Sequence, residues 1–357
     1  MATEFITSFA DGEYVLTSRL DSIQARTDKA KVAVAVIRDP DGEIDIFFQT
    51  TLYAFNGVVE LSALGKLIEE RFRARGRFTD MMSVVIDGVA LDFNVMYCTY
   101  NLNSDFDYRN CFWTTSQSSI VHRNSAISMA HMETGDRNYH VKVVGTDATG
   151  RTVMAERDFT RQSGTYWVSF AVNEIINFAL HKTEHDPGVE MVRVGYFSIE
   201  HGDIQKIYYL ADDPEYLLFR FRNLFNVPEF VDVVGKLKRK TSVDRDTAIC
   251  GGKSRHYNQV INRTFEVETG ALTPDQALTL EQLFCSHEVE LCGSVDDYRI
   301  LITDHTCEVD NDDENLVTMK FSFRMEGARP VLLDSEMAML VPGHTHIFTH
   351  EFTADFS

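Results

Sequence analysis

The sequence lacks the features that mark several protein classes. Its six cysteines are scattered, without the close pairs that a zinc site or a disulfide framework needs. No apolar run approaches the ~20 residues of a membrane-spanning helix, so we expect no membrane span. The first residues, Met1 to Phe5, carry neither the basic nor the apolar segment of a secretory signal. These absences favour synthesis and assembly in a reducing cytoplasm.

Basic residues are scarce. The chain has 34 Lys and Arg against 54 Asp and Glu, which leaves a formal net charge of −20 over 357 residues. Such a field repels phosphate backbones, so we expect no sequence-specific nucleic-acid binding. A hydrophobic content of 44% with 25% charged residues is typical of folded globular domains, and the length allows two or three of them.

No catalytic motif is complete. Gly251–Ser254 matches the end of a phosphate-binding loop, but Thr247 stands where that motif needs a glycine. The acidic run Asp310–Asn315 lacks the glycine of a calcium loop, and a solvated hairpin tip is favoured. No nucleophile can be matched with a base. We therefore predict a protein that is not an enzyme and binds no cofactor.

Three histidines near the end of the sequence are weak candidates for metal ligands. Side chains at i and i+2 of a strand point to the same face, which would bring His344 and His346 together, with His350 nearby. They have no fixed carboxylate or thiolate partner, so we predict no metal site. A metal-dependent enzyme is kept as a third hypothesis.

Two stretches share one plan. Gly57–Ser62 reads as a glycine, a short apolar strand and a serine in the N-cap position, and a helical pattern follows from Ala63 to Arg75. Gly164–Ser169 repeats this plan before Phe170–Lys182. Flanking strands and turns correspond as well, at offsets of 107 to 113 residues.

This repetition predicts the fold class. We expect a mainly β protein with packed helices (α+β), in which two tandem β-sandwich-like repeats, residues 1–117 and 118–230, each carry one helix. Residues 231–357 are expected to form a third, related β domain with a long arm. In that domain Thr273 to Gln276 predicts a capping box with proline at the first helical position.

The arm is expected over residues 231–263. The segment is too long for an ordinary loop, so we interpret it as two extended arms or a long hairpin. It contains a basic run, and in an acidic chain this run favours docking on an acidic neighbour and fixing the register between subunits. The predicted assembly residues are Lys236, Lys238, Arg239 and Lys240.

The region from about 205 to 335 resembles virion structural proteins of tailed phages and prophages. The resemblance is carried by Phe221–Glu229, Thr264–Thr269, the helix that ends at Phe284, Ile300–Asp304 and Leu316–Arg324. It implies tail-tube-like or tail-tip β-sandwich domains that are flanked by a helix and assembled as rings.

Two functions remain open at this point. The first is a non-enzymatic tail protein of a virion, assembled in the host bacterial cytoplasm, whose partners are copies of itself and other tail proteins. The alternative is a carbohydrate- or receptor-binding β-sandwich module, in which Trp113, Trp167 and surface tyrosines stack on sugars.

Overall fold

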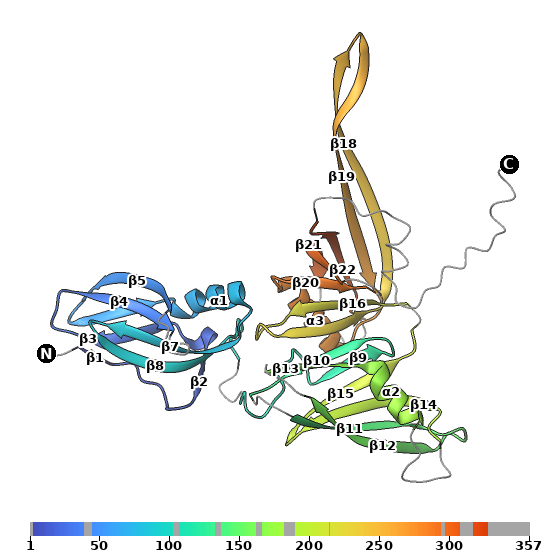
Figure 1. Ribbon diagram of the computed structural model, residues 1–357, viewed down its shortest axis with the longest axis horizontal. Helices are drawn as coiled ribbons and strands as arrows, with labels where there is room; N and C mark the ends of the chain where they lie inside the picture. The colour runs from blue at the N-terminus through green and yellow to red at the C-terminus, as the bar shows by residue number, and fades with distance from the viewer. Residues whose placement is uncertain are drawn as a thin grey trace. The chain divides into compact units, whose positions relative to one another are not determined.

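The structure is a computed structural model, and it describes residues 3–38, 45–102, 107–132, 137–161, 166–181, 190–213, 215–293, 297–307 and 317–327. The described chain is mostly β-sheet with three α-helices, as the sequence predicts at this coarse level (Figure 1). It divides into two compact units, Met1–Phe106 with Leu224–Val227, and Asp107–Asn223 with Pro228–Ser357. The boundaries expected at residues 117 and 230 stay predictions.

The first unit consists of two sheets, one α-helix and a short 3-10 helix, η1 (Thr17–Arg19). The strand orders are β1-β3-β6 and β2-β8-β7-β4-β5. Alternate strand residues such as Val34 and Val84 turn inward and pack with Ile68 and Phe72 of the helix into one core. The elements are β1 (Glu4–Phe5), β2 (Tyr14–Leu16), β3 (Ser22–Arg26), β4 (Lys31–Arg38), β5 (Asp45–Tyr53), β6 (Val58–Ser62), α1 (Leu64–Arg75), β7 (Thr79–Ile86) and β8 (Val89–Met96).

The start of α1 differs from the prediction. Ser62 is the last residue of β6, and the N-cap residue is Ala63, which has a φ of 56° and makes no side-chain cap bond. The N–H of Gly65 donates to the carbonyl of Leu20 at 2.8 Å. The predicted serine cap is wrong because a backbone carbonyl already satisfies this donor. At the other end the helix stops at Gly76, as the sequence predicts.

The second helix repeats this arrangement. Ser169 lies inside β13, opposite Ser128, so it is not an N-cap residue either. The N–H of Val172, the first residue of α2, donates to the carbonyl of Ser125 at 3.0 Å. In both units, a backbone carbonyl just before a paired strand accepts a hydrogen bond from the start of the helix, the role expected for a serine oxygen. The carbonyl is that of Leu20 before β3 and that of Ser125 before β10.

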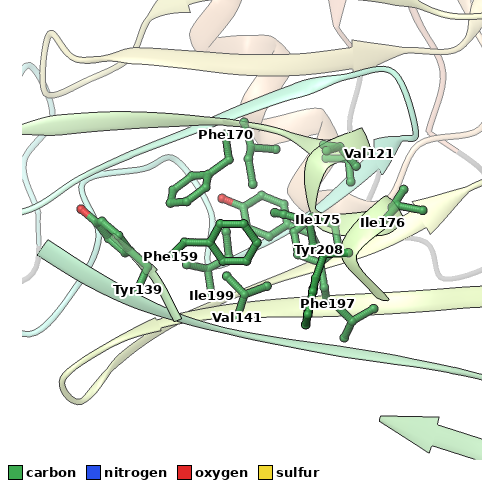
Figure 2. Packing of buried hydrophobic residues seen from close by; sticks show 14 of the residues in the cluster. Val121, Tyr139, Val141, Phe159, Phe170, Ile175, Ile176, Phe197, Ile199 and Tyr208 are labelled. Atoms are coloured by element: carbon green, nitrogen blue, oxygen red, sulfur yellow. The ribbon is translucent and has the colours of Figure 1, made fainter. Parts of the chain in front are cut away.

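The first part of the second unit consists of a five-stranded sheet, a two-stranded sheet and one helix. Figure 2 shows its core, in which the ring of Phe170 lies edge-on to Tyr139 at 5.4 Å and Phe197 stacks on Tyr208 at 5.1 Å. Such aromatic pairs add to the stabilisation from buried area. The elements are β9 (Ser118–His122), β10 (Ala126–Ala130), β11 (Arg137–Thr146), β12 (Thr152–Arg161), β13 (Trp167–Ala171), α2 (Val172–His181), β14 (Arg193–His201) and β15 (Ile204–Ala211).

The strand orders of this part of the second unit and of the first unit correspond. The five-stranded sheet of the first unit has the order β2-β8-β7-β4-β5, and that of the second has β9-β15-β14-β11-β12. In each, the first pair is parallel and the others are antiparallel. The smaller pairs β3-β6 and β10-β13 correspond too, and each helix follows the second strand of its pair.

The remainder of the second unit is a seven-stranded sheet with one helix. Its order is β17-β16-β20-β21-β22-β19-β18. The predicted capping box is confirmed: the side chain of Thr273 accepts from the N–H of Gln276, whose side chain accepts from the N–H of Thr273. The elements are β16 (Leu217–Arg222), β17 (Pro228–Val233), β18 (Gly235–Cys250), β19 (Lys253–Thr269), α3 (Pro274–Cys285), β20 (Val289–Cys292), β21 (Asp297–Cys307) and β22 (Met319–Met325).

Gly65 provides a test of the helix start in the first unit. A Cβ atom there would lie 2.0 Å from the carbonyl oxygen of Thr17, so we expect Gly65→Ala to destabilise α1 by about 1–3 kcal/mol in spite of alanine's higher helix propensity. Hydrogen exchange of peptides that span α1 should become faster. Lys66→Ala, an exposed neighbour, is the control. Unchanged exchange in Gly65→Ala would contradict the close approach.

Candidate functional site

A long β-hairpin runs from Gly235 to Thr269, whereas residues 231–233 of the predicted arm belong to β17. Strands β18 and β19 pair antiparallel from Gly235 opposite Thr269 to Cys250 opposite Lys253, and the hairpin projects from the seven-stranded sheet (Figure 1). The turn is made by Gly251 and Gly252, whose φ angles of 61° and 75° suit residues without a Cβ. Sixteen residues in β18 correspond to a ribbon of about 50 Å at ~3.4 Å per residue.

The base of the hairpin belongs to the core of the seven-stranded sheet. Phe265 and Val267 are buried, and Phe265 stacks on Phe323 of β22 with ring centroids 5.2 Å apart. Strand β22 pairs with β19 only over Phe265–Glu268. The core therefore holds the first few residue pairs and does not reach the rest of the ribbon.

The distal part of the hairpin is exposed. Every residue of β18 after Leu237 is exposed, and within the described chain the sheet has no strand beyond β18. Ile249 and Tyr257 expose 80% and 55% of their surface. A two-stranded hairpin is marginally stable at best in water, and open strand edges are templates for pairing with another chain. The distal ribbon therefore has the properties of an interaction surface.

The pairing register gives the ribbon two chemically different faces. Because alternate residues share a face, the register assigns seven cross-strand pairs to one side. We call this side the basic face. It contains arginines and apolar residues but no Asp or Glu. Its pairs are Leu237 with Val267, Arg239 with Phe265, Thr241 with Arg263, Val243 with Ile261, Arg245 with Gln259, Thr247 with His256, and Ile249 with Ser254.

The opposite side, the ion-pair face, carries the three lysines of the predicted assembly site. Lys238 pairs with Glu268 at 3.3 Å, and Lys240 forms a close ion pair with Glu266. Lys320 of β22 also reaches Glu266, at 2.8 Å. Carboxylates of the same chain thus offset the charges of Lys238 and Lys240, while Arg239 lies on the basic face.

Glu266 is the centre of the charges at the hairpin base. Hydrogen bonds from Lys240 and then Lys320 lower the pKa of Glu266 from 4.5 to about 2. The carboxylate form is therefore favoured in the folded state, and it ties β18 to β22 across β19. This contact is the electrostatic part of the hairpin's anchor.

A buried ion pair lies within the second unit, between β15 and β17. Lys206 Nζ is 3.5 Å from Glu229 Oε1, and both side chains are buried. Glu229 also accepts hydrogen bonds from the N–H and hydroxyl of Thr115 and from the amide of Asn223. Burial lowers the pKa of Lys206, and the Glu229 charge opposes that shift. Such a pair is stable only with complete hydrogen bonding.

A second buried polar cluster connects β9 to the same strand. Asp232 accepts from the backbone N–H of His122 at 2.7 Å and from the hydroxyl of Ser125, and its oxygen lies 2.9 Å from His122 Nδ1. The imidazole stacks on Tyr216 at 4.1 Å. Together the two clusters join β9 and β15 of the five-stranded sheet to β17 of the seven-stranded sheet.

A pocket of about 400 Å³ borders His122 and contains both acidic and basic residues. Its charged side chains have partners: Arg193 donates to Asp212 at 2.5 Å and Arg123 donates to Asn177 at 2.9 Å. Among its described lining residues there is no serine, threonine, cysteine or lysine. The Ser125 hydroxyl, which donates to Asp232 beside His122, is not among the described lining residues.

The other predicted residues are placed as follows. His344, His346 and His350 lie outside the described residues. Within the described chain, no group of three or more His, Cys, Asp or Glu side chains is placed to hold a metal ion. Trp113 is completely buried, so its ring is not available to a sugar, and Trp167 is half-buried beside a pocket of about 220 Å³. No described helix is long and apolar enough to cross a membrane.

Comparisons with solved structures include a weak likeness to a tail particle. No protein-family model matches the chain, and no curated protein matches it. A solved structure described as "Tail of empty GTA particle computed with helical refinement, C6 symmetry" matches with 14% identity and a TM-score of 0.21, over 33% of this chain and 96% of that one. The chain thus has a weak structural likeness to a tail-particle component, too slight to establish a shared fold.

The hairpin base should depend on pH through Glu266. The pKa of Glu266 is lowered in the folded state, so its carboxylate stabilises the fold fully above the unfolded pKa of 4.5. This stabilisation is lost as the pH falls towards 2. We expect the difference in urea midpoint between wild type and Glu266→Gln to be largest above pH 4.5 and to shrink below it. Glu268→Gln is the control. A difference that is constant from pH 7 to pH 3 would contradict this role.

The buried pair should be sensitive to the loss of one partner. Glu229→Ala leaves Lys206 buried without its counter-charge, and we expect it to cost about 3–5 kcal/mol. The double variant with Lys206→Met should recover much of that loss. Fluorescence during urea unfolding can follow this, because both tryptophans lie in the second unit. Glu268→Ala, which breaks an exposed pair, should cost no more than about 1 kcal/mol. Equal losses for Glu229→Ala and Glu268→Ala would contradict the assignment.

Proposed function

We propose that this chain is a non-enzymatic structural protein of a tailed-phage-type virion, which self-associates through the β18–β19 hairpin. The observation that carries the proposal is the exposed ribbon with its basic face. Gly235–Thr269 holds eight Lys or Arg and four Asp or Glu, a net charge of +4, in a chain of net charge −20. A basic ribbon on an acidic body is attracted to a second copy of that body, which favours association and fixes its orientation.

The two N-terminal sandwiches are proposed to be copies of one building unit. Their corresponding strand orders, the helix after the second strand of the smaller pair, and the carbonyl at each helix start support this. Repetition of one packing unit is a common way to build extended structural proteins. It gives the polypeptide several surfaces of related shape for an assembly.

The resemblance of residues 205–335 to virion structural proteins supports a place in the tail. The proposed partners are other copies of the chain and other tail proteins. The proposed location is the virion, after assembly in the host bacterial cytoplasm. Ring formation is part of the proposal, because one ribbon and one acceptor surface per copy make a head-to-tail contact that closes when the rotation permits.

The test is the mass of the particle in solution with and without the distal ribbon. Lys240 and Thr264 are directly opposite each other, so an Asn-Gly turn can replace residues 241–263 and leave the core-bound base intact. We expect full-length protein to sediment as an oligomer at micromolar concentration, dissociating as salt is raised, and the shortened variant to sediment as a monomer with unchanged circular dichroism.

A matched pair of charge variants serves as the control. Arg239→Glu with Arg245→Glu reverses two charges on the basic face, and Lys253→Glu with Arg255→Glu reverses two on the other face. The first pair should abolish association and the second should weaken it much less. A full-length chain that is monomeric at high concentration and unaffected by shortening the hairpin would contradict the proposed function.

A further inference from the structure

A row of apolar side chains crosses the outer face of the five-stranded sheet of the second unit. Met154 is paired with Val144, Val144 with Tyr196, and Tyr196 with Tyr209, so four neighbouring strands each contribute one residue. The rings of Tyr196 and Tyr209 are in contact at 6.0 Å. Met154 and Tyr209 expose 59% and 50% of their surface. We call these residues the tyrosine row.

The row is on the face of the sheet opposite the sandwich core. Val143 and Phe197, which immediately neighbour Val144 and Tyr196 along their strands, are buried in the core of Figure 2. Since successive strand residues point to opposite faces, the tyrosine row points outward. Tyrosines that are exposed on a flat sheet are typical of contact surfaces, because they bury a large area at little cost in conformational entropy.

Carboxylates lie beside the row. Glu156 follows Met154 on the outward face of β12 and lies 3.8 Å from Lys142. Asp158, the next outward residue, lies 2.9 Å from His140. Glu200 lies further along β14 on the same face, opposite His140. Three acidic groups thus face one lysine and one histidine, which leaves the margin of the row acidic.

We propose that the tyrosine row is the acceptor for the hairpin's basic face, supplied by a second copy of this chain. This inference rests on the proposed function and names the surface that the ribbon contacts. Both surfaces are made of β-strands whose alternate side chains point outward. They match in chemistry, since Val243 and Ile249 meet the apolar row while Arg239 and Arg245 meet its carboxylates.

The hairpin of the same copy does not reach this face. In Figure 1 the tip of the hairpin and strands β11 and β12 lie at opposite ends of the second unit. The contact is therefore between copies, with the ribbon of one molecule on the sheet of the next. Arginine side chains over tyrosine rings would add cation–π attraction to the pairing.

Cross-linking of variants with one introduced cysteine tests the contact, in a background that keeps only the buried Cys98 and Cys292. In a background with Cys111, Cys250, Cys285 and Cys307 replaced by Ser, one variant carries Met154→Cys on the acceptor face and another carries Thr247→Cys on the basic face. We expect the mixture to form a covalent dimer with a short bis-maleimide. The matched control is Ala248→Cys, which is the adjacent residue on the other face of the ribbon and is equally exposed. It should react at least about tenfold less, because alternate residues point away from each other.

Each outcome separates the inference from the proposed function. If sedimentation detects oligomers but cysteines at positions 247 and 248 cross-link equally, or neither cross-links, the acceptor assignment is wrong. Self-association of the chain would still hold. Absence of oligomers at every concentration overturns both. Binding of a glycan to the full chain on an array, lost in Tyr209→Ala, would assign the row to a sugar and overturn the inference.

Discussion

A pair of β-strands that is exposed on both faces cannot provide its own hydrophobic core, so the order of the hairpin depends on contacts outside the strand pair. Only the base of the β18–β19 ribbon is held by Phe265 and Val267 in the core of the seven-stranded sheet. The distal part has no comparable burial, while it carries apolar residues as exposed as Ile249. Its order depends on the strand pairing itself and, in our proposal, on a partner.

The same constraint explains the placement of charge. On the ion-pair face, lysines are matched by Glu266 and Glu268, so this face carries little net charge for a partner to recognise. On the basic face, arginines alternate with apolar residues and no carboxylate interrupts them. The network around Glu229 and the contacts of Asp232 connect the seven-stranded sheet, which carries the ribbon, to the five-stranded sheet.

The sequence predicts much of this fold because strand alternation and helix spacing are local properties. The mainly β class, the end of α1 at Gly76 and the capping box at Thr273 follow from neighbouring residues. The serine caps at 62 and 169 were wrong because the competing carbonyls come from distant residues, which no local pattern contains. The sequence predicts the basic run. Which face of the ribbon each basic residue lies on depends on the pairing register between β18 and β19, which no local pattern contains. Lys206 was missed, although a lysine alternating with Ile204 and Tyr208 was a signal of a buried charge.

The most direct measurement of the central claim is hydrogen exchange of the ribbon as a function of protein concentration. If a second copy covers the hairpin, amides between residues 241 and 263 should exchange rapidly in dilute protein and become protected as the concentration rises, while the core strands stay protected throughout. Exchange in this segment that is equally fast at all concentrations would contradict the claim that the ribbon is an assembly surface.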